Sequence, residues 1–339
     1  MTSASALLEG AVEAAAGAEY VAARFMSTRA GHLALHDGAV ESTGESTDRG
    51  IAVRVLVDGC WGFAASDTCT LPEAVRLAQS AVRLARLSSP LVSTRVELAG
   101  EPIHEGRWTS PYDIDPFAVP AAERVALLAE RSQALLGAEG IAHVDARLAM
   151  VQEDVHYLDN RGSIFSQHRS RIEAEWSATA IHPGTGAFPP VARGWEYLLG
   201  QGDTVNGARP WDWDTELAEL PGRLREKLAA PSVEPGRYTL VIDPTNLWLT
   251  IHESVGHATE LDRALGYEAN YAGTSFATPD QLGTLRYGSH LMHVTGDRTA
   301  AHGLATVGWD DEAVAAQEWD LVKDGILVGY QLDRAMAAE

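Results

Sequence analysis

The clearest folding signal in the chain is Gly50-Ile-Ala-Val-Arg-Val-Leu-Val57, with Asp58-Gly59 and Cys60-Trp-Gly-Phe-Ala64 directly after it. β-Branched and apolar residues fill both arms, and an Asp-Gly pair between such arms is typical of a tight hairpin turn. A second pair of strands is predicted within residues 146–180, on either side of the turn Asp159-Asn-Arg-Gly162. The first half of the chain is therefore predicted to contain β-hairpins.

Segments with helical spacing alternate with these strands. Thr70-Leu-Pro-Glu73 has the spacing of a capping box, with proline in the first turn of the helix that it opens. Apolar residues at helical period predict four helices in the first 230 residues, at 5–28, 70–87, 120–137 and 213–229. Because helices and hairpins occur together, the sequence predicts an α+β protein.

A short turn-rich stretch, Pro231-Ser-Val-Glu-Pro-Gly236, is the best candidate for a domain boundary. It follows residues 183–211, which are rich in loop-forming residues, and precedes a predicted strand at Tyr238–Ile242. We expect a mixed sheet and helix region before the boundary and a strand-rich domain after it. The expected bounds are 1–232 for the N-terminal region, with subdomains 1–100 and 118–232, and 235–339 for the C-terminal domain.

Composition and charge narrow the classes of function. The 339 residues are 45% hydrophobic and 22% charged, as in ordinary globular proteins, and no apolar stretch is long enough for a transmembrane helix. A formal net charge of −21 repels nucleic acid and anionic membranes, which argues against both as partners. Two cysteines and the lack of a recognisable signal peptide predict a cytoplasmic location.

One motif carries chemistry: His252-Glu-Ser-Val-Gly-His257, on a helix predicted over residues 245–261. Neutral imidazoles are good Zn²⁺ ligands, and an adjacent glutamate can accept a proton from a water that the metal activates. Zinc lowers the pKa of such a water from ~15.7 to about 7, so hydroxide forms at neutral pH. The alternative to a metal site is that the two histidines and the glutamate simply lie on the exposed and half-buried faces of a core helix.

The spacing of this motif demands a local distortion. Histidines five residues apart lie about 140° apart on an ideal helix of 3.6 residues per turn, so they cannot face one metal ion. A π-bulge widens the turn by one residue, and such bulges are frequent at functional sites. The metal hypothesis therefore predicts a π-bulge at 252–257, which Gly256 would ease.

Several further stretches extend the signal beyond the helix, and they share motifs with one known family. They are Ile251-His-Glu-Ser-Val-Gly-His-Ala-Thr-Glu260, Gly273–Ser275, Gly308-Trp-Asp-Asp-Glu312, Leu321-Val-Lys-Asp-Gly-Ile-Leu-Val-Gly-Tyr-Gln-Leu-Asp-Arg334 and Asp48-Arg-Gly-Ile-Ala-Val-Arg54. With them, the chain resembles the TldD/PmbA metalloprotease family over nearly its whole length. It is similar to the TldD type, which carries His-Glu-x-x-x-His, whereas the TldE/PmbA branch lacks that motif.

The resemblance implies a zinc peptidase that acts on short or unfolded peptides. Its active site would be enclosed by two subunits, either with a TldE/PmbA-like partner or as a homodimer. Carried over residue by residue, His252 and His257 match the zinc ligands and Glu253 matches the general base. The motif stretches around Gly273, Thr274 and Ser275 imply a substrate-binding loop.

The chain departs from the family pattern at the third ligand. In the family this ligand is a Cys far toward the C-terminus, and Cys60 and Cys69 lie too early to match it. We therefore expect that the chain lacks the family's C-terminal segment and that another polypeptide or a substitute residue completes the site. The candidates for a third ligand or a supporting residue are Glu260, Asp262, His290, His293, His302, Asp310, Asp311 and Glu312.

The predicted reaction is hydrolysis of a peptide bond, with Zn²⁺ as cofactor. Two alternatives remain open on the sequence. The first is an amide hydrolase for one peptide-like metabolite in a biosynthetic pathway. The second is a subunit without activity that encloses a partner's substrate.

Overall fold

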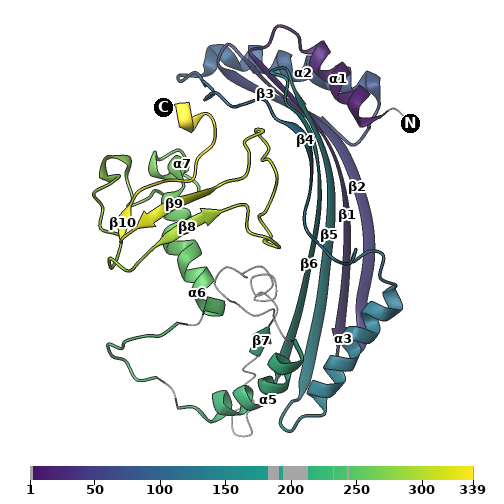
Figure 1. Cartoon of the computed structure of the whole chain (residues 1–339), viewed down its shortest axis with the longest axis vertical. Helices are drawn as coiled ribbons and strands as arrows, with labels where there is room; N and C mark the ends of the chain where they lie inside the picture. Colours follow the sequence, from purple (N-terminus) through teal and green to yellow (C-terminus); the bar gives the residue numbers. More distant parts are fainter. Residues whose placement is uncertain (1–2, 182–190, 194–212, 232, 243, 339) are drawn as a thin grey trace.

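A long, curved β-sheet forms the body of the protein in the computed structural model (Figure 1). The structure describes residues 3–338 apart from 182–190, 194–212, 232 and 243. The sheet has the order β3-β2-β1-β5-β6-β4, with β7 also paired to β6, and all pairs are antiparallel except β4 with β6. Its strands are β1 (Tyr20–His36), β2 (Ala39–Val57), β3 (Cys60–Ser66), β4 (Glu105–Thr109), β5 (His143–Asp159), β6 (Ile164–Thr179) and β7 (Val191–Arg193).

The predicted hairpin signals form two of the connections in this sheet. Asp58 and Gly59 adopt φ values of 51° and 67°, the left-handed conformation that a tight hairpin turn needs. At the other turn, Asp159 Oδ1 accepts hydrogen bonds from three successive backbone amides, those of Arg161, Gly162 and Ser163. Local side chain to backbone bonding of this kind explains why the sequence signal was reliable.

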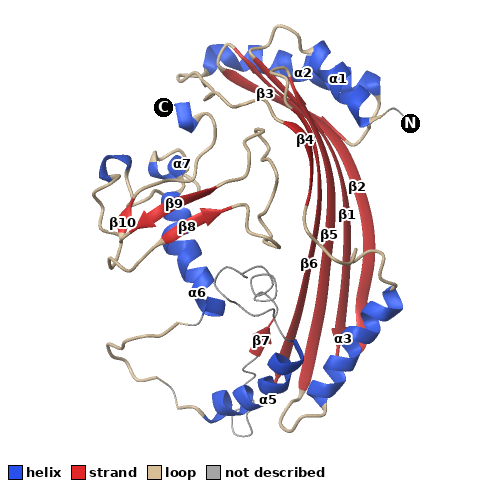
Figure 2. Cartoon of the chain, in the orientation of Figure 1, coloured by secondary structure: helices blue, strands red, loops and turns tan. Residues whose placement is uncertain are grey.

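Helices cover the convex side of the sheet (Figure 2). Side chains of α1 and α2 pack on Val21, Ile51 and Val53, and Gly62 allows close approach, since a Cβ there would overlap the carbonyl of Ala81. At the other end, α3 and α5 join a second core around the fully buried Trp176. These helices are α1 (Ala4–Ala14), α2 (Leu71–Ser88), α3 (Ala121–Leu136) and α5 (Trp213–Ala229). Two more, α6 (Pro244–Ile251) and α7 (Leu261–Ala264), belong to the C-terminal part.

The C-terminal part of the chain lies on the concave side of the sheet (Figure 1). It contains α6, α7 and a small antiparallel sheet in the order β10-β9-β8. Its strands are β8 (Val294–Asp297), β9 (Glu318–Lys323) and β10 (Ile326–Leu327). The combination of helices and largely antiparallel sheets confirms the predicted α+β class.

Residues 308–312 fasten this part to the large sheet, and we call them the docking segment. The buried Gln167 of β6 accepts hydrogen bonds from the amides of Gly308 and Trp309 at 2.8 and 3.0 Å, and donates to Trp309 O at 2.8 Å. The Trp309 ring stacks on Phe165, with centroids 4.7 Å apart. Apolar stacking and satisfied backbone groups together hold the two parts in one orientation.

Two predicted elements were wrong, and the side chain of Thr70 makes no capping hydrogen bond, contrary to the capping box predicted there. The helix expected over 5–28 ends at Ala14, and the apolar residues from Tyr20 onward belong to β1, where cross-strand burial overrides helical spacing. The strand expected at Tyr238–Ile242 does not form, because no described segment pairs with it, and Val241 is 99% exposed. The loop predicted over 183–211 lies outside the described residues, except for Val191–Arg193, which form β7.

Among the described residues, every helix is too short or too polar to span a bilayer.

Candidate metal centre

The histidine motif lies where α6 changes its winding. Regular α-helix ends at Ile251, residues His252–Gly256 form a π-turn, and His257 begins a short 3-10 turn. The amide of His257 donates to the carbonyl of His252, which is the five-residue step of a π-bulge. This confirms the predicted bulge. Glycine is not needed for space, since a Cβ at position 256 would meet only Ile251 O at 3.8 Å.

The bulge brings the three chemical groups of the motif together. One nitrogen of His252, one nitrogen of His257 and one carboxylate oxygen of Glu253 lie within 4.8 Å of one another. The two imidazole rings meet edge to face, with centroids 4.3 Å apart. His252 and Glu253 are exposed, with 51% and 63% of their side chains accessible, so the group is open to a ligand from solvent.

A carboxylate holds the His257 ring in place. His257 Nδ1 lies 3.0 Å from Glu260 Oε1, and Glu260 Oε2 lies 3.2 Å from Arg263 Nε. A carboxylate at Nδ1 selects the tautomer with its proton there, which leaves Nε2 with a free lone pair. Glu260 was a candidate third ligand. In the structure its carboxylate bonds the Nδ1 side of the His257 ring and so fixes the orientation of that ring.

Side chains from distant loops satisfy the carbonyls of the irregular turns. Tyr287 Oη donates to Ser254 O at 2.5 Å, Gln331 Nε2 to Gly256 O at 2.7 Å, and Ser275 Oγ to Ala258 O at 2.6 Å. Burial raises the pKa of Tyr287 to about 12, so its hydroxyl remains a donor. π and 3-10 turns leave carbonyls without regular helical partners, so these three side chains stabilise the bulge.

The sequence did not single out Tyr287 or Gln331 as site residues, because neither is a metal ligand and both act through backbone carbonyls 33 and 75 residues away. The substrate loop at Gly273, Thr274 and Ser275 stays a prediction. Ser275 contacts Ala258, the residue directly after the motif, and Gly273 and Thr274 are exposed.

Most of the other candidate ligands have different partners. His293 Nε2 lies 3.7 Å from Asp324 Oδ1, and Asp262 Oδ1 accepts the amide of Arg263. His290 is exposed in a loop, and His302 occupies a turn with φ 64°. Among the described residues, the donor group around the motif contains His252, Glu253 and His257 and none of these candidates.

The acidic run Asp310, Asp311 and Glu312 belongs to the docking segment. Asp311 pairs with Arg24 at 2.6 Å, and Glu312 pairs with Arg54 at 2.7 Å, both arginines being on the large sheet. Asp310 accepts the amides of Glu312 and Val314, and burial raises its pKa. These contacts show that the run joins the C-terminal part to the sheet.

The Gln331 amide offers a test of how the bulge is stabilised. Gln331→Ala removes the donor to Gly256 O and to Thr259 Oγ1, and we expect the free energy of unfolding to fall by about 1–3 kcal/mol. Zinc affinity should fall as well, because the two imidazoles then lose their fixed separation. Urea denaturation and zinc titration measure both effects, with the exposed Gln317→Ala as the control. Equal values for the two variants would show that the bulge does not depend on Gln331.

Two imidazoles next to a carboxylate on one helix are an arrangement that zinc-dependent hydrolases use, with the imidazoles as ligands and the carboxylate as general base. Two family models match this chain: PmbA/TldA metallopeptidase domain 1 over residues 21–85, and the PmbA/TldA metallopeptidase C-terminal domain over residues 235–339. The residues matched by the second model include the whole motif His252–His257. The chain belongs to the PmbA/TldD metallopeptidase family.

Curated relatives carry related names at low identity. A metalloprotease of Methanothermobacter thermautotrophicus is 26% identical over 94% of this chain and 65% of its own length. A zinc metalloprotease TldD homolog of Saccharolobus solfataricus is 26% identical over 38% of this chain and 27% of its own length. The chain spans slightly under two thirds of the full-length curated relatives it matches.

Solved structures share the fold. A candidate modulator of DNA gyrase from Bacteroides thetaiotaomicron matches 98% of this chain and 72% of its own, with a TM-score of 0.72 and 16% identity. TldE from Thermococcus kodakarensis matches 96% of this chain and 70% of its own, with a TM-score of 0.62 and 15% identity. At these identities the likeness concerns the fold alone.

Proposed function

We propose that this chain is a zinc-dependent peptidase whose centre is the group His252, Glu253 and His257. The observation that carries the proposal is the π-bulge, which turns a five-residue spacing into a convergent donor set. Membership of a metallopeptidase family and relatives named metalloproteases support it.

The chemistry of the donors fits zinc. His252 and His257 would hold the ion through neutral imidazole nitrogens, and Glu260 already orients the second ring. When bound, zinc supplies a Lewis acid that polarises a carbonyl and lowers the pKa of a water ligand. The remaining positions are open to water, substrate or a donor from a second polypeptide.

Glu253 performs the proton transfers in this proposal. Its carboxylate is exposed next to both imidazoles, so it can accept a proton from the attacking water and donate it to the leaving amine. Both transfers use the same group, first as a base and then as an acid.

The substrates we propose are short or unfolded peptides, bound in an assembly of two subunits. The exposed position of Glu253 and His252 supports an arrangement in which a second subunit covers the site. The fold likeness to TldE supports either a TldE-like partner or a second copy of this chain.

Zinc stoichiometry tests the proposal. Elemental analysis of His257→Ala should show one zinc per chain fewer than the wild type, because the remaining imidazole cannot hold the ion alone. His293→Ala is the matched control, since its imidazole also lies beside a carboxylate but outside the donor group. Equal zinc content in the wild type and His257→Ala would refute the assignment.

A further inference from the structure

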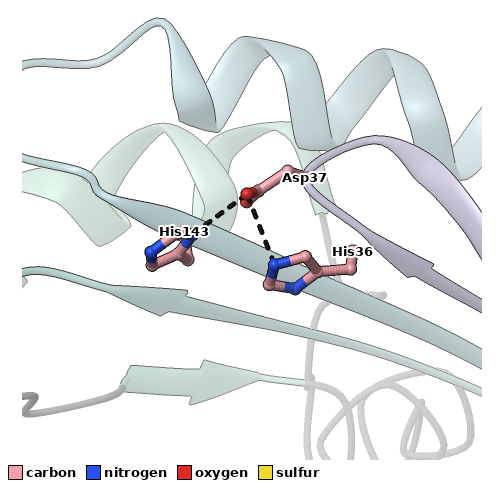
Figure 3. A group of neighbouring side chains, drawn as sticks. All are labelled: His36, Asp37 and His143. Carbon is pink, nitrogen blue, oxygen red and sulfur yellow. Dashed lines mark hydrogen bonds and ion pairs between the residues drawn. The ribbon is translucent and has the colours of Figure 1, made fainter.

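We infer a second metal site at the far end of the large sheet, formed by His36, Asp37 and His143 (Figure 3). Asp145 is its orienting residue. His36 is the last residue of β1, Asp37 opens the turn to β2, and His143 begins β5. The ligand would be a divalent transition metal ion, and we take Zn²⁺ as the class representative, because two imidazoles and one carboxylate favour it.

The distances among the donors suit one ion. Asp37 Oδ2 lies 3.4 Å from His36 Nε2 and 2.9 Å from His143 Nδ1, and a donor atom from each residue lies within 4.8 Å of the others. Ligand bonds of ~2.0–2.1 Å in a tetrahedron place neighbouring donors about 3.3 Å apart. Binding therefore requires side-chain shifts of about an ångström.

Backbone and side-chain contacts already hold these donors in position. Asp37 Oδ1 accepts the amide of Val144 at 2.9 Å, which leaves Oδ2 for the two histidines. Gln133 Nε2 of α3 donates to Asp37 O at 3.2 Å. Before any ion arrives, β5 therefore holds the Asp37 carboxylate and α3 holds the Asp37 backbone carbonyl.

Asp145 provides a second, independent sign of a ligand site. It lies directly opposite His36 in the ladder between β1 and β5, and its Oδ1 is 2.9 Å from His36 Nδ1. A carboxylate at Nδ1 keeps the proton there and turns the lone pair of Nε2 toward Asp37. Histidines that bind metals have this arrangement in most sites, with a carboxylate or carbonyl on the nitrogen away from the ion.

The site is open and separate from the histidine motif. About half of each imidazole is accessible, at 50% for His36 and 46% for His143, so an ion can enter from solvent with water as its fourth ligand. The rings lie nearly parallel, at 21°, with centroids 5.4 Å apart. Bound there, the ion would connect the turn between β1 and β2 to the start of β5 and so stabilise this end of the sheet.

Titration with Zn²⁺ in a background without the first site tests the inference. The double variant His252→Ala/His257→Ala of the full chain should still bind one Zn²⁺ per chain in calorimetry and equilibrium dialysis. Adding His36→Ala or His143→Ala should abolish that binding, and adding Asp145→Asn should weaken it by about 10- to 100-fold. Adding His168→Ala should leave it unchanged, because His168 pairs with Asp154 at 2.8 Å and lies outside the donor group.

The outcomes separate the two sites. No Zn²⁺ bound in the double variant, or binding that survives in both His36→Ala and His143→Ala, would overturn the second site and leave the proposed function untouched. Circular dichroism of each variant confirms that a loss of binding does not reflect unfolding. Loss in the His168→Ala control as well would also count against the site, since it would show dependence on the sheet and not on these donors.

Discussion

Glu253→Ala should retain zinc and lose peptide hydrolysis by about 10²- to 10⁴-fold, the range that general acid–base catalysis contributes. The Glu253 side chain is 63% exposed, so its removal should leave the free energy of unfolding within about 0.5 kcal/mol of the wild type. kcat on a panel of unstructured peptides measures the effect, alongside zinc content by elemental analysis.

The control for this variant is Glu318→Ala, an exposed carboxylate at the start of β9, which should hydrolyse peptides at the wild-type rate. If Glu253→Ala cleaved peptides as fast as the wild type, the mechanism would be wrong. Hydrolysis of a single peptide in the panel by the wild type would favour the dedicated amide hydrolase over a general peptidase. No cleavage with zinc bound would favour the subunit without activity.

Gln167→Ala should have the largest effect on stability, at about 3 kcal/mol of unfolding free energy. Its amide is 6% exposed and serves Gly308 N, Trp309 N and Trp309 O. Truncation leaves these three backbone groups without their side-chain partner where the docking segment meets β6. Each unsatisfied buried group costs about 1–3 kcal/mol, although entering water offsets part of that cost.

The effect should be local as well as global. Hydrogen exchange in residues 308–316 should accelerate in Gln167→Ala, while exchange in β1 and β5 stays slow. Gln317→Ala, exposed and directly after residues 308–316, serves as the control in both urea denaturation and exchange. Unchanged exchange in residues 308–316 would show that the Trp309 ring and the arginine pairs hold the segment without Gln167.

Local chemistry explains which parts of the fold were predictable. Asp58-Gly59 and Asp159-Asn-Arg-Gly162 encode their turns in residues that contact one another, and the α2, α3 and α5 helices follow their apolar spacing. The strand error at Tyr238–Ile242 has the opposite cause. β-Prone residues form a strand only when a partner satisfies their backbone groups, and no described segment does so.

The candidate metal centre was also predictable only in part. Five-residue spacing between two histidines, next to a glutamate, was enough to require a π-bulge, because helix geometry is a property of the local chain. The sequence does not show which distant side chains support the bulge, because Tyr287 and Gln331 reach it only after the loops fold back.

The sequence by itself predicted the α+β class, the family and the candidate site His252, Glu253 and His257, because local motifs carry each of these signals. Only the tertiary structure shows that Asp310, Asp311 and Glu312 belong to the docking segment, which contacts the large sheet. It also shows that His36, Asp37 and His143 lie close together. The pairs Arg24–Asp311, Arg54–Glu312 and Asp37–His143 join residues more than 100 positions apart, and the ladder register of β1 and β5 positions the last of them. Because register depends on burial along the whole sheet, no local pattern could have revealed them.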